Sequence, residues 1–245
     1  MMKLFSRPKL NTTVYKLLYA DMHSHLIPGI DDGSPDMKTS LELIRGLIDL
    51  GYKKLITTPH IMWDMYKNRR EVILQKLEEL QKAVEQEKLD VQISAGAEYF
   101  LDNHVRELLA SKQPILTIGD NLVLVEFSLA SAPVDFKELL FELQLQGYQP
   151  VIAHPERYIY MEFKRDFFTE LKDAGYYFQA NLLSFGNYYG RSVMETANYL
   201  AKKEYYDFVG TDLHNSKYLE ALHNPSLIPP LKRLLDSGKI KNAQL

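Results

Sequence analysis

Short apolar runs rich in β-branched and aromatic residues recur along this chain, and each is followed by a segment whose apolar residues have helical spacing. This alternation is typical of repeated βα units, which build a parallel sheet covered by helices on both faces. At 245 residues the chain has the usual length of one α/β barrel. The seven runs predicted to be strands are Val14 to Asp21, Lys54 to His60, Val91 to Glu98, Leu122 to Phe127, Pro150 to Glu156, Tyr176 to Asn181 and Tyr205 to Asp212.

The segments between these runs predict several helices. The first would begin with Ser34 as its N-cap and Pro35 at the first helical position, and it would end at Gly51. Further helices are predicted over residues 68–87, 135–146 and 191–203, and residues 226–238 are predicted to form a proline-interrupted helical segment. In the helix over residues 68–87, the side chains expected to face the core are Val72, Leu77, Leu80 and Val84.

We expect a single domain over residues 1–245, because no linker, repeat or low-complexity tract interrupts the series. Residues 1–13 would be an N-terminal extension and residues 216–245 a C-terminal helical cap. A closed or nearly closed barrel is the simplest way to cover such a sheet on both faces. A doubly wound open sheet is the alternative, but the phosphate loops that would support it, GxGxxG or GxxxxGK followed by Ser or Thr, do not occur.

Composition excludes several classes of function. The net charge of −3 gives no basic field that would attract nucleic acid or an anionic membrane. The absence of cysteine excludes disulfides, thiolate metal sites and a cysteine nucleophile, so a phosphatase here cannot work through a thiol. The first residues lack the apolar stretch of a signal peptide, and no later run is as long as a membrane span, which predicts a cytoplasmic protein without membrane insertion.

In a βα barrel the functional residues gather where the strands end, because the loops there surround one mouth of the barrel. Nearly every predicted strand of this chain ends in a polar residue that could bind a metal or a phosphate. Five of the seven histidines are among them, whereas His104 and His223 lie in helix-like segments outside the pattern. The strand-end residues are Asp21, His23, His25, His60, Glu98, Glu126, His154, Glu156, Arg157, Asn181, Asp212 and His214.

Several of these residues also have an ordinary structural interpretation. His23 and His25 would point to the same face of an extended chain and could bind one ion, yet alone such a pair is more often surface or core histidine than a ligand pair. Asp212 could cap a helix. Glu98 and Glu126 are harder to explain, because burial at the end of an apolar strand is costly unless the carboxylate is paired or binds a metal. Together with the strand-end histidines, they predict a metal centre.

The ligand chemistry narrows the kind of ion. Imidazole and carboxylate without sulfur suit Mn²⁺, Fe²⁺ or Zn²⁺ and do not choose among them. The candidate ligands are too many for one ion, which points to two or three ions that share a carboxylate. Clustered ions of this kind most often clamp the attacking and leaving oxygens of a phosphoryl transfer.

The sequence Asp31-Asp32-Gly33 has two interpretations. It is either a turn assisted by glycine before the first helix, or a source of carboxylates for the centre. The calcium-loop template fails here, because its ligand at the twelfth position and the flanking pair of helices are missing. An EF-hand is therefore excluded.

With these residues in view, the sequence resembles the PHP (polymerase and histidinol phosphatase) superfamily, and within it the bacterial protein-tyrosine phosphatases of the capsular-polysaccharide type. The resemblance spans residues 19–215. It rests on the motifs DMHSHLIPGIDDG, ITTPH, GAE, LVEF, VIAHPERY and GTDLHN, which occur in the family's order and with similar spacing. It implies an α/β fold, a distorted (β/α)₇ barrel, with three metal ions at its mouth, commonly Mn²⁺.

The resemblance also implies roles for individual residues. Asp32 would be a ligand, whereas Asp31 would be either a support for the ligands or a turn residue, so that Asp32→Asn should lower activity more than Asp31→Asn. One ion would be held by His23, His25, Glu98 and Asp212, a second by Glu98, Glu126 and His154, and the third by Asp32, His60 and His214.

Arg157 would contact the phosphate, because its planar guanidinium suits bidentate contact with phosphate oxygens. The alternative interpretation of Arg157 is a surface arginine that follows a turn. Arg157, His60 and Asp32 are the residues expected to act in catalysis. The family has a second arginine after the last histidine motif, and this chain lacks it there. Lys217 or His223 could take its place in binding substrate, or the second phosphate contact comes from elsewhere.

On this resemblance we predict hydrolysis of phosphotyrosine on proteins by a water that the ions activate. The resemblance implies that the partner is an autophosphorylating bacterial tyrosine kinase that governs capsule and exopolysaccharide export. Residues 61–70, with the sequence IMWDMYKNRR, are either a basic and aromatic rim that docks such a peptide or simply the loop leading into the next helix.

Three other functions are weighed against this prediction. A phosphatase of a small metabolite, such as a histidinol phosphatase, is the nearest alternative. A PHP nuclease is disfavoured by the acidic net charge and the absence of an attached polymerase. A degenerate, non-catalytic metal-binding module is disfavoured because a candidate ligand occupies every expected position. The oligomeric state is left open.

Overall fold

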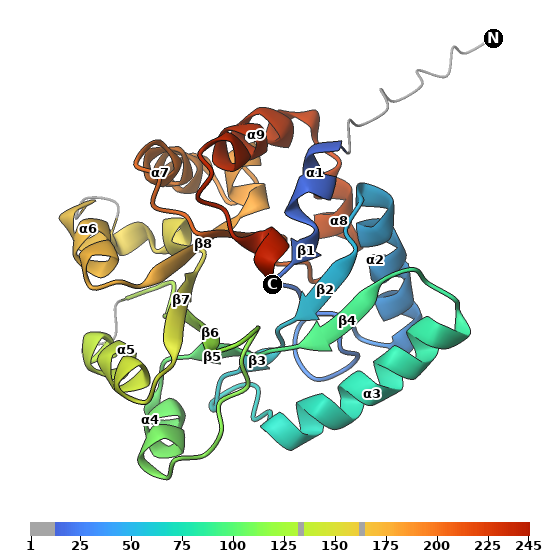
Figure 1. Cartoon of the computed structure of the whole chain (residues 1–245), viewed down its shortest axis with the longest axis horizontal. Helices are drawn as coiled ribbons and strands as arrows, with labels where there is room; N and C mark the ends of the chain where they lie inside the picture. The colour runs from blue at the N-terminus through green and yellow to red at the C-terminus, as the bar shows by residue number, and fades with distance from the viewer. Residues whose placement is uncertain (1–12, 132–134, 162–164) are drawn as a thin grey trace.

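The computed structural model describes residues 13–131, 135–161 and 165–245. In these residues the strands lie in the middle of the molecule and the helices are arranged around them (Figure 1). The chain runs almost directly from β2 into β3 and from β4 into β5, so the strands occupy seven positions. The strands are β1 Ala20–Asp21, β2 Lys54–Thr57, β3 His60–Ile61, β4 Gln92–Ala95, β5 Glu98–Phe100, β6 Leu122–Glu126, β7 Gln149–Ala153, β8 Tyr177–Asn181 and β9 Phe208–Gly210.

All neighbouring strands are parallel, in the orders β1-β2-β4 and β3-β5-β6-β7-β8-β9. The last strand position returns to the first through a short ladder beyond β1 and β9. There Ser24 and Leu213 form a parallel bridge, and the His25 N–H donates to the carbonyl of Leu213 at 2.9 Å. The Asp212 N–H donates to the carbonyl of His23 at 2.8 Å. The predicted α/β barrel of seven parallel positions is confirmed.

The first predicted strand is wrong over most of its length. Residues 13–18 form helix α1, Thr13–Leu18, and only Ala20 and Asp21 belong to a strand. The buried side chains of α1 are Val14, Tyr15 and Leu18, which have helical spacing, whereas a strand would bury every second residue. Tyr19 has a positive φ of 64° and separates the helix from β1.

The helices predicted between the strands are present, with small differences at their ends. The first begins after Asp36 rather than Ser34, because the Asp36 carboxylate accepts the N–H of Thr39 while the Ser34 hydroxyl donates to the Asp36 carbonyl. Gly51 ends it with a φ of 114°. The helices are α2 Met37–Leu50, α3 Arg70–Gln86, α4 Asn103–Ala110, α5 Phe136–Leu145, α6 Arg165–Asp173, α7 Arg191–Lys202, α8 Ser216–Leu222 and α9 Ile228–Asp236.

Short 3-10 helices complete the fold. They are η1 Pro155–Arg157, η2 Ile159–Met161, η3 Leu182–Gly186, η4 Pro225–Leu227 and η5 Asn242–Gln244. The predicted C-terminal cap thus consists of α8, η4, α9 and η5, and the prolines of α9 stand in its first turn, where no helical hydrogen bond is lost. Of the predicted N-terminal extension, residues 1–12 lie outside the described residues.

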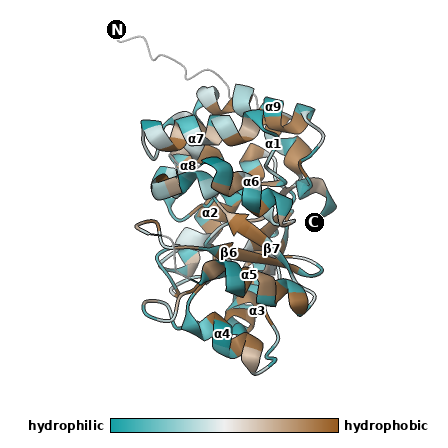
Figure 2. Cartoon of the chain, turned by 90° about the vertical axis from the view of Figure 1, so that its left-hand side faces the viewer, coloured by the Kyte–Doolittle hydropathy of each residue, from teal (hydrophilic) through white to brown (hydrophobic). Residues whose placement is uncertain are grey.

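Two apolar clusters hold the strands and helices together. A small one, which includes Met22, Leu124 and Phe208, is formed mostly by strand residues, and a large one includes the buried faces of the helices. In α3 the buried residue of the first turns is Ile73 rather than the predicted Val72, which is 41% exposed. Strands β6 and β7 are mainly hydrophobic, and the helices carry both hydrophobic and hydrophilic residues (Figure 2). Over the described ranges, no helix combines the length and hydrophobicity needed to cross a membrane.

Candidate metal centre

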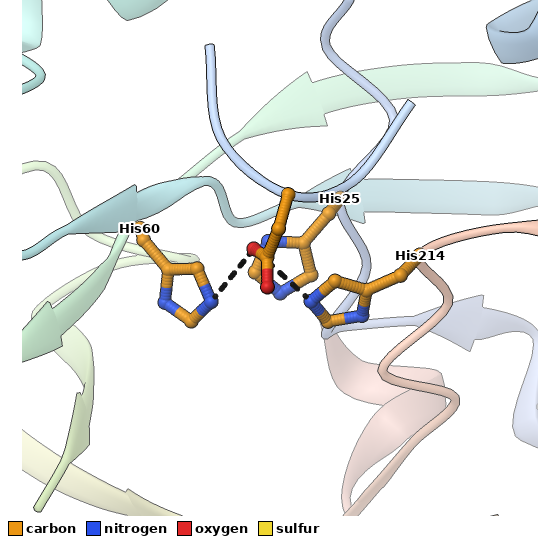
Figure 3. A group of neighbouring side chains, drawn as sticks. His25, His60 and His214 are labelled. Atoms are coloured by element: carbon orange, nitrogen blue, oxygen red, sulfur yellow. Dashed lines mark ion pairs between the residues drawn. The ribbon is translucent and has the colours of Figure 1, made fainter. Parts of the chain in front are cut away.

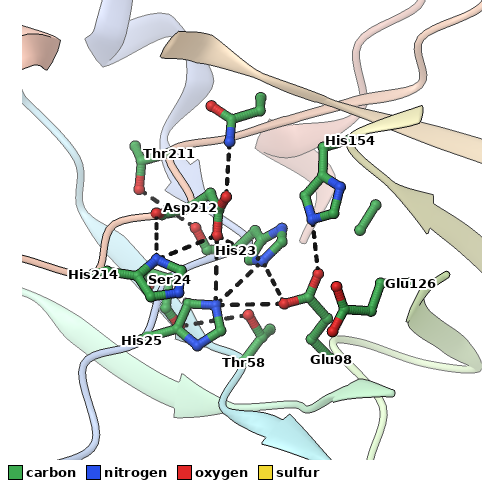
Figure 4. A network of polar contacts seen from close by, with 12 residues as sticks. His23, Ser24, His25, Thr58, Glu98, Glu126, His154, Thr211, Asp212 and His214 are labelled. Atoms are coloured by element: carbon green, nitrogen blue, oxygen red, sulfur yellow. Dashed lines mark hydrogen bonds and ion pairs between the residues drawn. The ribbon is translucent and has the colours of Figure 1, made fainter. Parts of the chain in front are cut away.

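The residues predicted as metal ligands converge where the strands end. Figure 4 shows seven of the nine together, namely His23, His25, Glu98, Glu126, His154, Asp212 and His214. The strand register places His60 of β3 opposite Glu98 of β5, and Glu126 closes β6 beside Phe100. Among the described residues, three groups have ligand atoms within 4.8 Å of one another. They are His23, His25, Glu98 and Asp212; His25, Asp32, His60 and His214; and His60, Glu98 and Glu126.

The first group is the most buried. Nε2 of His23 lies 3.1 Å from Oε2 of Glu98 and 3.3 Å from Oδ1 of Asp212. Nε2 of His25 lies 3.5 Å from each of the same two oxygens. Two imidazole nitrogens and two carboxylate oxygens therefore face one point, and these four residues are the set predicted for the first ion.

The second ring nitrogen of each of these histidines is held by another side chain. Nδ1 of His23 lies 2.8 Å from Oε1 of Gln179, whose Nε2 donates to the carbonyl of Ala180. Nδ1 of His25 donates to Oδ2 of Asp31 at 2.8 Å. Such partners fix the tautomer and leave Nε2 as the ligand atom. The sequence interpretation left Asp31 undecided and did not identify Gln179, which follows an apolar residue inside a strand and has no motif to mark it.

Asp32 lies at the exposed side of the centre. Its Oδ1 is 3.5 Å from Nε2 of His60 and 3.6 Å from Nε2 of His214, and its side chain is 54% exposed. The rings of His25, His60 and His214 gather around this point (Figure 3). The rings of His25 and His214 stack with centroids 3.9 Å apart. This group unites the three residues predicted for the third ion and adds His25.

The group predicted for the second ion is arranged less compactly. Nε2 of His154 lies 3.0 Å from Oε1 of Glu98, but His154 is not part of the compact groups found in the described chain. His60 takes that place, since its Nδ1 lies 3.0 Å from Oε1 of Glu126 and 3.3 Å from Oε2 of Glu98. His60 thus lies between two of the predicted ion positions.

Charge at the centre is set by its buried carboxylates. Burial lowers the pKa of His60, but Glu98 and Glu126 outweigh burial and raise it to about 9. Burial raises the pKa of Glu98, yet the neighbouring histidines, His23 first, hold it well below its ordinary value. Glu98 therefore stays ionised and requires positive charge at this point, which protons or divalent cations can provide.

Buried atoms without partners also fit a metal. Oε1 of Glu126 and Nδ1 of His60 face each other, and neither has a partner with hydrogen-bond geometry in the described structure. Nδ1 of His154 is likewise buried without a partner. Buried polar atoms are normally satisfied, and carboxylate and imidazole are ligands of Mn²⁺, Fe²⁺ and Zn²⁺. The donor set therefore fits divalent ions.

Arg157 lies beside the ligands on η1. Its Nη1 donates to Oδ2 of Asp212 at 2.8 Å, and its guanidinium carbon lies 4.5 Å from the centroid of the Tyr189 ring. Asn181 donates to the same Asp212 oxygen at 2.8 Å. Arg157 lines a cavity of about 500 Å³ together with Asp32, His60, Glu98, Glu126, His154, Asp212 and His214. A positive planar group and the predicted ligands thus share one cavity.

The two residues considered as a second phosphate contact do not line this cavity. Lys217 is exposed on α8, and neither Lys217 nor His223 is among the residues that line the cavity. His223 follows the last turn of α8 and contacts the carbonyl of Leu219 through its Nδ1. The role of Lys217 in substrate binding stays a prediction, which the set of residues lining the cavity does not support.

Two glycines allow the backbone to approach the histidines. A Cβ added to Gly33 would lie 2.3 Å from Cβ of His25, and one added to Gly210 would lie 2.6 Å from Cβ of His23. Real Cβ atoms do not approach so closely. Gly33 is the glycine of the DDG sequence, so its role is close approach to His25 as well as turn formation.

A parallel α/β barrel with clustered histidines and carboxylates at its strand ends defines a protein with a candidate metal centre. The chain belongs to the CpsB/CapC family: the family model described as "Capsular polysaccharide synthesis, CpsB/CapC" matches residues 19–223. The resemblance to the capsular-polysaccharide family, which the motifs indicated, is confirmed.

Similar proteins carry informative names. The tyrosine-protein phosphatase YwqE of Bacillus subtilis is 30% identical over 198 residues, which are 80% of this chain and 78% of the relative. The tyrosine-protein phosphatase CpsB of Streptococcus agalactiae is 26% identical over 200 residues, 80% of this chain and 82% of the relative. A crystal structure from work on YwqE and on CpsB of Streptococcus pneumoniae, described as metal-dependent tyrosine phosphatases, has a TM-score of 0.79 at 27% identity and covers 92% of this chain and 90% of its own.

Proposed function

We propose that this protein is a metal-dependent phosphatase that hydrolyses phosphotyrosine on proteins. The observation that carries the proposal is that clustered histidines and carboxylates share one cavity with the guanidinium of Arg157. The relatives named tyrosine-protein phosphatases support the reaction, and the family description supports a role in capsule synthesis.

The proposed metal ligands are those of the motifs. One ion would be held by the first group and would share Glu98 with a second ion, at Glu126 and His154, while Asp32, His60 and His214 would hold a third. Mn²⁺ is the proposed ion, with Fe²⁺ and Zn²⁺ compatible with the same ligands. Bound divalent ions polarise phosphoryl oxygens and lower the pKa of water, which supplies a nucleophile without a cysteine.

The chain's own residues would bind and orient the substrate. Arg157 presents a planar guanidinium, which suits the equatorial oxygens of a phosphoryl group. Asp31 and Gln179 hold the ring nitrogens of the two adjacent histidines and keep both rings in place. The leaving phenolate of tyrosine has an ordinary pKa near 10, so it needs little protonation when the ester bond breaks.

The substrate is proposed to be a bacterial tyrosine kinase that carries phosphotyrosine and controls capsule or exopolysaccharide synthesis. A cytoplasmic location is part of the same proposal. The support is the match to the capsule-synthesis family together with the similarity to phosphatases of that name.

Metal analysis combined with activity measurements tests this function. Purified protein is expected to contain divalent metal and to hydrolyse a phosphotyrosyl peptide faster than histidinol phosphate. Chelation should abolish hydrolysis, and re-addition of Mn²⁺, Fe²⁺ or Zn²⁺ should show which ion restores it. Preference for histidinol phosphate would identify a metabolite phosphatase, and cleavage of single-stranded DNA would identify a nuclease.

Variants separate the proposed roles. His23→Ala should abolish metal-dependent hydrolysis, because the first group loses one of its imidazoles. Arg157→Ala should lower kcat roughly 100- to 1,000-fold, the usual effect of removing one donor to a developing anionic charge. Arg191→Ala is the matched control, since the Arg191 side chain is 84% exposed on α7. An active His23→Ala protein would overturn the proposed centre.

A further inference from the structure

The cavity at the metal centre is polar at its buried end, and apolar and aromatic side chains line its exposed side. Glu98 and Asp212 are almost completely buried, whereas Met65 is 67% exposed and Leu129 is 41% exposed. Two half-buried tyrosines, Tyr66 and Tyr218, line the same cavity. A molecule that places a phosphate among the histidines would therefore extend past these two rings.

Tyr66 is attached to one side of the centre. Its ring stacks on that of His60 with centroids 5.6 Å apart and an angle of 14° between the planes. The short turn that carries Tyr66 is closed by hydrogen bonds between Tyr66 and Met62 in both directions, at 2.7 Å and 3.2 Å. The N–H of Trp63, inside the turn, donates to Asp102 at 3.0 Å. The backbone thus holds the ring beside a predicted ligand.

Tyr218 is attached to the other side. Its ring centroid lies 5.4 Å from that of His214 and 5.1 Å from that of Tyr188. It also contacts Tyr189, the ring on which the Arg157 guanidinium rests. One aromatic cluster therefore supports both Tyr218 and the proposed phosphate contact, which fixes the distance between them.

We propose that Tyr66 and Tyr218 recognise the phenyl ring of the substrate and make the site selective for aromatic phosphate esters. His60 and His214, whose rings lie 6.0 Å apart, face the third predicted ion position. The ring of Tyr66 lies next to that of His60, and the ring of Tyr218 lies next to that of His214. The group attached to a phosphate bound at the centre would pass through that region. Aromatic rings attract each other at centroid separations of 4.5–7 Å, whereas a short alkyl chain offers no such partner. This inference rests on the proposed function, because it requires a phosphate ester at the centre.

Two non-hydrolysable inhibitors test the inference by binding rather than by turnover. The inhibition constants of phenylphosphonate and methylphosphonate are measured for the metal-loaded wild type and for Tyr66→Leu and Tyr218→Leu. The wild type should bind phenylphosphonate more tightly, and each Leu variant should reduce that preference roughly three- to tenfold. Tyr66→Phe and Tyr218→Phe keep the ring and should keep the preference. Phe141→Leu, at a side chain 56% exposed on α5, is the control outside the cavity.

The outcomes are distinct. A wild type that binds both inhibitors equally, or Leu variants that keep the preference for phenylphosphonate, would overturn the inference. A Leu variant that weakens both inhibitors to the same extent has damaged the centre, and it would remove that tyrosine from the proposal. Since the tyrosines come from different segments, each variant tests its own residue. Failure of the proposed phosphatase function would be visible separately, as absence of metal-dependent hydrolysis by the wild type.

Discussion

The carboxylate of Asp31 accepts a hydrogen bond from Nδ1 of His25 at 2.8 Å and another from the N–H of His60 at 3.1 Å. Asp32, the next residue, instead turns its carboxylate towards the Nε2 atoms of His60 and His214. The side chain of Asp31 is completely buried, whereas that of Asp32 is half exposed. Burial raises the pKa of Asp31, but the charge of His25 outweighs it and lowers the pKa to about 2, so Asp31 is ionised at neutral pH. The two adjacent aspartates thus have different roles. Asp31 holds Nδ1 of His25, whereas Asp32 lies near the Nε2 atoms of His60 and His214.

Replacing each aspartate by asparagine should separate these tasks. Asp32→Asn removes a proposed ligand and should lower kcat strongly even at saturating metal. Asp31→Asn keeps an acceptor near His25 but loses its charge, so it should weaken metal binding roughly 10- to 100-fold and recover activity when metal is added. Metal titrations followed by calorimetry and by activity measure both effects. The reverse order would mean that Asp31 is the ligand.

Gly33→Ala should destabilise the protein by about 1–3 kcal/mol, because the new methyl group would overlap Cβ and the carbonyl oxygen of His25. Urea unfolding of the metal-free protein measures the change without contributions from the ion. Gly119→Ala is the matched control, since its methyl group would make an ordinary contact 3.5 Å from Leu245. Equal free energies of unfolding for the two variants would contradict the assigned close approach.

Removing the metal should lower the melting temperature. A ligand at 100 times its dissociation constant stabilises the folded state by about 2.7 kcal/mol, which corresponds to roughly 5–10 °C for a protein of this size. Thermal melts with and without a chelator measure the shift. His23→Ala should shrink it, whereas His223→Ala, at the end of α8 and outside the cavity, should keep it. A chelator-independent melting temperature for the metal-loaded wild type would contradict the centre.

The single tryptophan offers a pH-dependent signal away from the centre. The Trp63 ring stacks on His104 with centroids 3.7 Å apart, and burial lowers the pKa of His104 below its ordinary 6.5. His104 should therefore become charged only below pH 6.5, and contact with imidazolium should then change Trp63 fluorescence. The stabilisation from neutral His104 is fully present above pH 6.5 and is lost as the pH falls through the folded-state pKa. His104→Gln should remove the titration, and a midpoint above 6.5 would contradict the assignment.

The barrel could be predicted from the alternation of strands and helices, and the convergence of the ligands could be predicted because they follow the strand ends. Once the strands are parallel and neighbouring, residues such as His60 and Glu98 must meet at one edge, whatever the loops do. The features that could not be predicted from the sequence depend on tertiary contacts. Val14 to Leu18 have the composition of a strand, but packing makes them a helix. The orientations of Asp31 and Asp32 within one turn follow no period that a sequence could reveal.

The ladder between residues 23–25 and 212–214 has a consequence for biosynthesis. A nascent chain leaves the ribosome with its N-terminal end first, yet His23 and His25 meet Asp212 only after about 190 further residues have been made. The two histidines therefore emerge long before the carboxylate that completes their group. We therefore expect partially synthesised chains to lack activity, which would arise only when the barrel joins its first strand to its last.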